Sequence, residues 1–273
     1  MTRGRPGEGF RTEDLHSFVV PAHGQSPHLA DCLASLVGQT RRSQIVVATA
    51  TPFDGLAELV RGHGARLVVN PAGGGIGRDW NFALAQAATP WVTLAHQDDI
   101  YLPAFTERTM ALATARPDMR IVFTGYRELL DGRERGATAM LAIKRLLLER
   151  GFLGRRAVSG RAAKLRLLTL GCPIPCPSAT LRLDGFPLRF REDMKVNLDW
   201  EAWTRLASAE GAFGYARASL MLHRIHDSSE TSAGVRDGAR AREDLSMFRQ
   251  FWPDRMARML ARAYARSYQS APG

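Results

Sequence analysis

The sequence predicts an α/β fold: a mostly parallel sheet flanked by helices, with a helical basic insert and a helical C-terminal tail. Short apolar runs alternate with segments of helical spacing throughout the first hundred residues. These runs are apolar on both faces, as expected of parallel strands that helices cover on each side. The chain has 273 residues, of which 45% are hydrophobic, so it can bury the core of one large domain.

Four short apolar runs, each bounded by turn residues, are the strands expected in the first half. They cover 16–22, 44–50, 65–70 and 90–95. Helical spacing predicts helices between them over 26–39, 52–63 and 78–88. The first helix has Ser26 as a suitable N-cap and Pro27 at its first position. Ligands of such sheets bind at the carboxyl ends of the strands, so the loops there are the expected site.

The rest of the chain predicts further elements, without a linker that would separate two domains. In order, they are a helix over 102–117, a strand over 120–129, basic amphipathic helices within 133–170, a strand over 178–183, a helix over 198–210 and a strand pair within 213–226. The Arg-rich tail, 233–268, is expected to be helical with a break near Pro253. We therefore expect a single domain, 1–273.

The chain carries a net charge of +10, which suggests anionic partners. Within 133–166, ten Lys and Arg residues face only Glu134 and Glu149, a local net charge of +8. A basic amphipathic helix of this kind lies on an anionic membrane surface, or it is an ordinary packing helix with a solvated Arg face. No recognised DNA or RNA module is present, so we expect no specific nucleic-acid binding.

Three features concern the location of the protein. No apolar run approaches the roughly 20 residues that span a bilayer, and the polar segment 1–17 lacks the apolar region of a signal peptide. The cysteines, Cys32, Cys172 and Cys176, are odd in number, which argues against a disulfide framework. These features predict a cytoplasmic protein.

Two adjacent carboxylates, Asp98 and Asp99, directly follow the fourth predicted strand, after His96 and Gln97. Adjacent like charges are tolerated where they face water or where a cation lies between them. Hard cations such as Mg²⁺ take carboxylate oxygens and usually retain waters and substrate phosphates. The pair therefore indicates either a divalent metal site or a solvated turn in which Asp99 caps the following helix.

Four segments resemble, in order, those of inverting family 2 glycosyltransferases with the GT-A (Rossmann-like) fold. Residues 18–40 (FVVPAHGQSPHLADCLASLVGQT) resemble the first strand and helix, and 70–103 (NPAGGGIGRDWNFALAQAATPWVTLAHQDDIYLP) the approach to the DxD metal motif. Residues 190–207 (FREDMKVNLDWEAWTRLA) resemble the segment with the catalytic base, and 221–231 (MLHRIHDSSET) the closing R-x-H-x-x-S segment. The order and spacing of these segments are more specific than any one of them.

The resemblance implies a divalent metal, Mg²⁺ or Mn²⁺, that stabilises the leaving diphosphate of a nucleotide-sugar donor. Asp98 aligns with the last Asp of the DxD motif and His96 with the first, so Asp98 and then Asp99 are the expected ligands. His226 resembles the late His of the family and is expected at the metal or the phosphates. Arg224 is expected to meet the diphosphate. The alternative for Arg224 and His226 is an ordinary exposed strand end.

The base that the resemblance implies is Asp199, at the start of the predicted helix 198–210. Inversion needs a base to take the proton of the acceptor hydroxyl. Alternatively Asp199 only caps the helix, and the helix dipole is expected to hold its pKa down. Glu201 is the second candidate, and Trp200 and Trp203 are expected to pack rather than to bind sugar.

The donor-binding residues expected from the resemblance are Pro21, His23, Trp80, Asn81, Gln97, Asp98 and Arg224. The chain departs from the family at 48–51 (ATAT), where an Asp usually reads the nucleobase, so a UDP-, GDP- or dTDP-sugar remains open. Trp80 either stacks on the base or packs. His23 either reaches the nucleotide or lies in a surface turn.

The resemblance implies an inverting transfer of a sugar to an acceptor, which we expect to be a carbohydrate or lipid-linked acceptor of cell-envelope polysaccharide synthesis. Residues 1–130 are the expected donor half, 131–232 the acceptor half and 233–273 the tail. The insert, 133–170, suits a lipid-linked phosphate and peripheral contact with the inner face of the plasma membrane. The alternative is a glycosyltransferase-like binding protein without turnover, which His96 in the DxD position permits.

Overall fold

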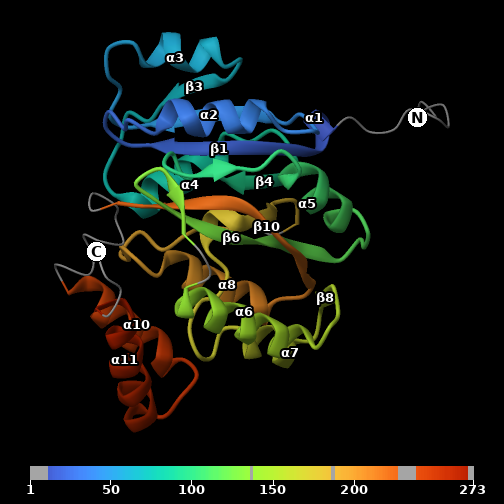
Figure 1. Cartoon of the computed structure of the whole chain (residues 1–273), viewed down its shortest axis with the longest axis vertical. Helices are drawn as coiled ribbons and strands as arrows, with labels where there is room; N and C mark the ends of the chain where they lie inside the picture. The colour runs from blue at the N-terminus through green and yellow to red at the C-terminus, as the bar shows by residue number, and fades with distance from the viewer. Residues whose placement is uncertain (1–11, 136–137, 186–187, 227–237, 270–273) are drawn as a thin grey trace.

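The structure is a computed structural model that describes residues 12–135, 138–185, 188–226 and 238–269 (Figure 1). A curled sheet runs through the molecule, and helices cover both of its faces. Among the described helices, none is both long enough and apolar enough to span a membrane.

The first half of the sheet is parallel, as predicted. Its strands are β1 (His16–Ala22), β2 (Gln44–Thr49), β3 (Arg66–Val69) and β4 (Trp91–Leu94). They lie in the order β3-β2-β1-β4, and each neighbouring pair is parallel. Between them run α2 (Leu29–Val37), α3 (Leu56–Gly62) and α4 (Ile76–Ala85). The carboxyl ends of β1, β2 and β4 therefore meet at one edge.

The second half of the sheet is mixed rather than parallel. Here β9 (Ala179–Arg182) lies antiparallel between β4 and β6 (Met119–Leu130), and β10 (Ala212–Ile225) runs parallel to β6. The short β5 (Ile100–Tyr101) pairs antiparallel with β10. Two further short strands are also antiparallel to their partners: β7 (Arg133–Glu134) pairs with β6, and β8 (Ala157–Val158) pairs with β10.

The predicted strand pair within 213–226 is wrong, because β10 is one continuous strand. Its pairing with β6 shifts register between Ala216 and Ser219 and again between Ser219 and Met221. Such an irregularity interrupts the alternation of side chains and resembles a turn in the sequence. Gly125 of β6 lies at this point, where an added Cβ would be 3.1 Å from Oγ of Ser219.

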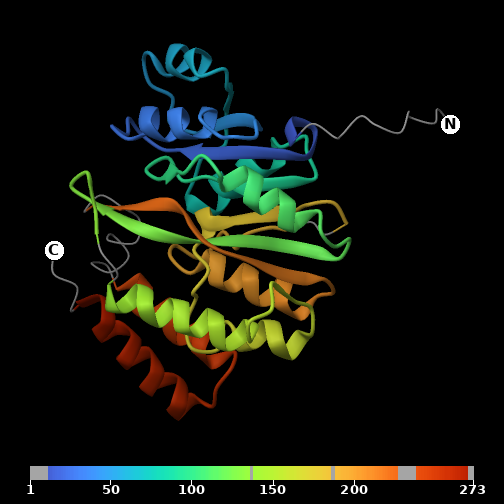
Figure 2. The same ribbon diagram turned by 45° about the vertical axis from the view of Figure 1, so that its right-hand side comes forward.

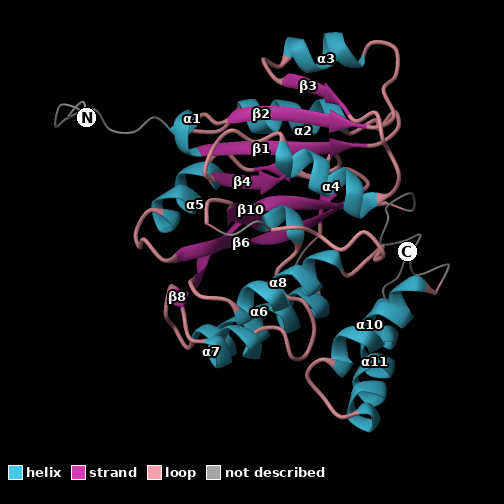
Figure 3. Ribbon diagram, turned by 180° about the vertical axis from the view of Figure 1, so that it is seen from behind, coloured by secondary structure: helices cyan, strands magenta, loops and turns pink. Residues whose placement is uncertain are grey.

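The remaining helices gather mainly beyond β6 and β10, at the opposite end of the molecule from α3 (Figures 2 and 3). They are α6 (Ala139–Phe152), α7 (Arg161–Arg166), α8 (Leu198–Ser208), α10 (Ala239–Arg249) and α11 (Asp254–Gln269). The 3₁₀ turn η1 (Cys176–Ser178) precedes β9, α1 (Thr12–Leu15) precedes β1 and α5 (Phe105–Ala113) precedes β6.

Two tryptophans of α8 anchor this helix in the larger core, as predicted. Trp200 and Trp203 are fully buried. Their indole N–H groups donate to the carbonyl oxygens of Leu168 and Ile174, each at 3.0 Å. Buried indoles with satisfied N–H groups contribute much of the stability of a core. These bonds fix the segment that leads into η1 against the start of α8.

Candidate active site

The carboxylate of Asp98 lies where three strand ends meet. Oγ of Ser26, in the loop after β1, donates to Oδ1 of Asp98 at 2.9 Å. On the other side, Nε2 of His226, just beyond β10, lies 3.2 Å from Oδ2 of Asp98. The side chains of Asp98 and His226 are 24% and 21% exposed, so a ligand can reach both. Two of the predicted metal-binding residues are thus side by side.

The register of β5 explains this meeting. Ile100 pairs with Leu222 and Tyr101 with Met221 in the antiparallel β5–β10 ladder. Continuing the ladder backwards brings the turn at 98–99 beside 223–226. Residues 227–231, the end of the R-x-H-x-x-S segment, lie outside the described residues.

Asp99 points inward and is only 1% exposed. Its Oδ1 accepts hydrogen bonds from Nδ1 of His223 and from the backbone N–H of Arg224, both at 3.0 Å. Burial alone would raise the pKa of Asp99, but the charge and hydrogen bond of His223 hold it below its ordinary value. Burial likewise works to lower the pKa of His223, and Asp99 raises it overall. Asp99 does not cap a helix, because α5 begins only at Phe105.

Arg224 holds the turn that carries the two carboxylates. Its Nε donates to the carbonyl oxygen of Asp98 at 2.9 Å, and its Nη2 lies 3.3 Å from Oδ2 of Asp31 in α2. The side chain is 11% exposed. Whatever contact Arg224 makes with a diphosphate, the described bonds already give it a function in fixing this edge of the sheet.

Gln97 joins the loops that follow β1 and β4. Its side-chain oxygen accepts from the backbone N–H of His23 at 3.1 Å, and its amide nitrogen donates to the His23 carbonyl at 3.0 Å. The next residue, Gly24, donates its N–H to Oγ1 of Thr51, after β2, at 2.7 Å. Three strand-end loops therefore converge, as the sequence predicts. Pro21, partly exposed near the end of β1, lies in the same region.

The partly exposed His96 and the buried Trp80 form an aromatic pair behind the carboxylates. Their rings lie 5.1 Å apart, and Trp80 also meets the ring of Phe190 edge-on. Trp80 is 7% exposed, so of its two predicted functions the structure supports packing. Burial lowers the pKa of His96, which keeps the imidazole neutral. Its Nε2 is buried and has no hydrogen-bond partner among the described residues.

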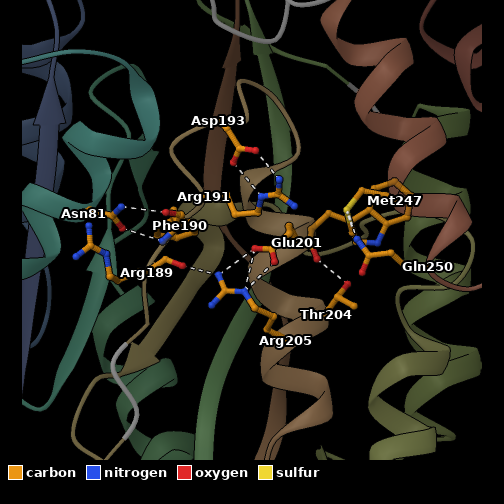
Figure 4. Close-up of polar contacts among 11 residues, drawn as sticks. Asn81, Arg189, Phe190, Arg191, Asp193, Glu201, Thr204, Arg205, Met247 and Gln250 are labelled. Carbon is orange, nitrogen blue, oxygen red and sulfur yellow. Dashed lines mark hydrogen bonds and ion pairs between the residues drawn. The ribbon is translucent and has the colours of Figure 1, made fainter.

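Asn81 holds a loop and also lines a cavity of about 450 Å³, together with Arg78, Arg189 and Glu192. Its Oδ1 accepts from the backbone N–H of Phe190 at 2.7 Å, and its Nδ2 donates to the Phe190 carbonyl at 2.9 Å (Figure 4). The same loop meets α8, where Arg205 donates to the carbonyl of Arg189 and pairs with Glu201 at 2.8 Å. This ion pair occupies Glu201, the second candidate for the base.

Asp199 lies at the first turn of α8. Its Oδ1 accepts from the backbone N–H of Trp200 at 2.7 Å, and its Oδ2 from the backbone N–H of Cys176, in η1, at 3.2 Å. Burial raises the pKa of Asp199, and the N–H of Trp200 and the charge of Lys144 offset this only in part. The expectation that the helix dipole holds this pKa down is therefore wrong, since desolvation outweighs the helix terminus.

The match to known sequences covers more than half of the chain. The family model "Glycosyl transferase family 2" matches residues 17–183, which include β1 to β4 and the carboxylate pair. The chain belongs to glycosyl transferase family 2. No curated protein sequence matches it significantly.

Solved structures of glycosyltransferases share the fold of this family 2 chain. Fragment 1–349 of S. aureus TarS in complex with UDP-GlcNAc superposes with a TM-score of 0.61 at 15% identity, covering 94% of this chain and 73% of the fragment. The chain spans 44% of longer TarS. The mannosyltransferase PcManGT from Pyrobaculum calidifontis, in complex with GDP-Man and Mn²⁺, gives 0.61 at 15% identity, with 94% and 76% covered. Glucosyl-3-phosphoglycerate synthase from Mycobacterium tuberculosis, with Mn²⁺, UDP and glucosyl-3-phosphoglycerate, gives 0.51 at 18% identity, with 82% and 79% covered.

Within this glycosyltransferase fold, the described residues hold no group of three or more His, Cys, Asp or Glu side chains placed to bind a metal. Mg²⁺ and Mn²⁺ do not require one, because one or two protein ligands with waters and substrate phosphates complete their coordination. Asp98 and His226 provide two suitable ligand atoms from different strand ends. The donor set therefore fits a metal that the donor diphosphate helps to hold.

Sequence reasoning missed the groups that hold the segment just before Asp199. The carboxylate of Glu243, in α10, accepts the backbone N–H groups of Lys195, Val196 and Asn197 at 2.7, 3.0 and 2.8 Å. Nδ2 of Asn197 donates to Oδ1 of Asp244 at 2.8 Å. These bonds tie the approach to α8 to the C-terminal helices. No local pattern marks Glu243, because its partners lie almost fifty residues earlier.

His223 was also missed, although it stands one residue before the Arg224 that the closing motif marks. Behind it, Tyr126 of β6 meets the His223 ring edge-on at 6.0 Å. Nζ of Lys144, from α6, donates to the hydroxyl of Tyr126 at 2.9 Å. The basic insert thus reaches the carboxylate turn through a chain of side chains.

Proposed function

We propose that this family 2 glycosyltransferase is a metal-dependent, inverting enzyme that moves a sugar from a nucleotide diphosphate to an acceptor hydroxyl. The observation that carries the proposal is the 3.2 Å approach of His226 to Asp98 at the edge where the strand ends converge. The fold neighbours bound to UDP-GlcNAc or to GDP-Man with Mn²⁺ support a nucleotide-sugar donor.

Asp98 and His226 would hold Mg²⁺ or Mn²⁺. Bound there, the metal would neutralise charge that develops on the leaving diphosphate. Asp99 is the other predicted ligand, but its Oδ2 is buried and has no partner among the described residues, so we assign Asp99 to supporting the turn rather than to the metal. Its Oδ1 meanwhile orients His223 and the backbone of Arg224. Gln97 and His23 would shape the nucleotide side of the site.

Asp199 would act as the base. The acceptor oxygen forms its bond to the anomeric carbon as the bond to the diphosphate breaks, and the diphosphate leaves with that electron pair. The hydroxyl proton passes to the Asp199 carboxylate. The raised pKa of Asp199 suits this task, because a more basic carboxylate accepts a proton more readily.

The halves of the chain would divide the substrates between them. Residues 1–130 would bind the donor, 131–232 the acceptor, and the tail would brace α8 through Glu243. A carbohydrate or lipid-linked acceptor of cell-envelope polysaccharide is the proposed class. A cytoplasmic protein in peripheral contact with the inner face of the plasma membrane through 133–170 would reach such an acceptor.

Turnover of a panel of UDP-, GDP- and dTDP-sugars tests the proposal. We expect release of one nucleoside diphosphate with Mn²⁺, none with a chelator, and loss in Asp98→Asn and Asp199→Asn. Asp184→Asn is the matched control, because Asp184 is exposed, pairs with Arg182 and lies at the opposite edge of the sheet. Turnover that survives the chelator or Asp98→Asn contradicts the metal site. No turnover of any donor by folded protein supports the binding protein instead.

A further inference from the structure

A cavity of about 200 Å³ lies between α6 and α11. Its wall is almost entirely apolar, with Met140, Ile143 and Leu147 from α6 and Leu260 from α11. Residues 170–173 complete the wall. Figure 2 shows both helices on the same side of the sheet, beyond β6 and β10. An apolar cavity of this kind favours an aliphatic or aromatic ligand.

One cation, Lys144, lies among these apolar residues. Its Nζ donates to the hydroxyl of Tyr126 and lies 5.4 Å from the centre of the Tyr126 ring. Within the described part of the chain, no carboxylate lies within salt-bridge distance of Lys144. An ammonium has three donors, and a partly buried one without a counter-charge favours an anionic ligand.

The cavity adjoins the proposed base. Cys172 lines the cavity, and the pKa of its thiol is raised by burial and by the charge of Asp199. Asp199 in turn accepts the N–H of Cys176, four residues further on. The charge of Lys144 also acts on both Asp199 and His223. A ligand in the cavity with its anionic group at Lys144 would therefore lie close both to Asp199 and to His223, which holds Asp99.

The outer surface of the same two helices is amphipathic. Ile143 and Leu146 of α6 are 51% and 67% exposed, and Met256 and Met259 of α11 are 41% and 57% exposed. Besides Lys144, α6 carries two Arg residues, and α11 carries four. Exposed apolar side chains beside cations are suited to an aliphatic chain with an anionic headgroup.

We infer that the cavity between α6 and α11 binds the acceptor, and that this acceptor is an aliphatic lipid phosphate. The chain would lie against Ile143, Leu147 and Leu260, with the phosphate at Lys144. The hydroxyl to be glycosylated would belong to a hydroxylated group esterified to the far side of that phosphate, and it would then reach Asp199. The inference rests on the proposed function and names its acceptor class.

Calorimetric titration of the full chain with decyl phosphate, below its micelle concentration, tests the inference. We expect saturable binding that Lys144→Gln weakens about tenfold or more, because a charge-assisted contact is lost. Arg145→Gln is the matched control, since Arg145 is the exposed neighbour on the same helix. Ile143→Asp should also weaken binding, and Leu153→Asp, at a residue 66% exposed beyond the end of α6 and outside the cavity wall, should not.

Other ligands separate the remaining explanations. Inorganic phosphate that binds as tightly as decyl phosphate would show a free-phosphate site and overturn the lipid. Equal weakening by Lys144→Gln and Arg145→Gln would show surface adsorption and overturn the cavity. Metal-dependent nucleotide binding should be unchanged in Ile143→Asp. If nucleotides bind and decyl phosphate does not, the inference fails alone; if decyl phosphate binds and no nucleotide does, the proposed function fails.

Discussion

Oδ2 of Asp98 and Nε2 of His226 lie 3.2 Å apart, although the two residues follow different strands of the sheet. The short antiparallel pairing of β5 with β10 brings them together. Both side chains are accessible, while the neighbouring Asp99 is buried beneath them. The adjacent carboxylates therefore differ in their surroundings, and we expect their substitutions to differ in effect.

Replacing Asp99 should affect stability more than replacing Asp98. Asp99→Asn removes the charge that pairs with His223 in a buried setting, and we expect a loss of about 1–3 kcal/mol in the free energy of unfolding. Asp98→Asn should change it by less than about 1 kcal/mol, because Asp98 is partly solvated. Chemical denaturation of both variants measures the difference. Equal losses would contradict the separate functions given to the two carboxylates.

The Asp99–His223 pair also predicts a pH dependence. The lowered pKa of Asp99 gives stability that is present above about pH 4 and is lost as the pH falls through the folded pKa. The raised pKa of His223 gives stability that is present below about pH 6.5 and is lost as the pH rises through the folded value. The stability difference between wild type and His223→Gln should thus be largest at about pH 5–6. A difference that is flat from about pH 5 to 9 would show that the pair is not ionic.

Asp199→Asn should lower kcat by about 10²- to 10⁴-fold, the usual contribution of a general base. Nucleotide binding should be unchanged, because Asp199 lies in α8 and not among the strand-end loops. In the wild type, activity should fall as the pH falls through the raised pKa of Asp199, since the base must be ionised. Single-turnover rates across pH provide the test. A variant that retains most of kcat would move the base elsewhere.

Glu243→Gln should reduce kcat without a matching change in donor affinity. The carboxylate accepts three backbone N–H groups ahead of Asp199, and a neutral amide accepts them more weakly. We expect a loss of about 1–3 kcal/mol in stability as well. Glu210→Gln, at an exposed position beyond the other end of α8, is the control. An unchanged kcat in Glu243→Gln would show that the tail does not position the base.

The sequence was most informative where structure depends on local periodicity. Apolar runs located β1 to β4, and the polar residues after them located the loops that Gln97 and Ser26 now join. Sequence patterns did not predict those features that depend on contacts between residues far apart in the chain. The irregular register of β10 against β6 resembled two strands, and the partners of Glu243 and Lys144 come from distant segments.

The sign of one electrostatic effect also required the structure. Asp199 stands at a helix start, which alone favours its ionised form. Its burial, which depends on how η1 and α8 pack, has the opposite and larger effect. Position along a helix is readable from sequence, whereas desolvation depends on the folded surroundings.

We propose above that Asp98 and His226 hold a metal that binds the donor diphosphate. The most direct test of this proposal is calorimetric titration of UDP, GDP and dTDP, each with and without Mn²⁺, on wild type, Asp98→Asn and the control Asp184→Asn. We predict that one nucleotide binds only with Mn²⁺, that Asp98→Asn abolishes this binding and that Asp184→Asn preserves it. Binding that does not depend on Mn²⁺, or that persists in Asp98→Asn, would contradict the account.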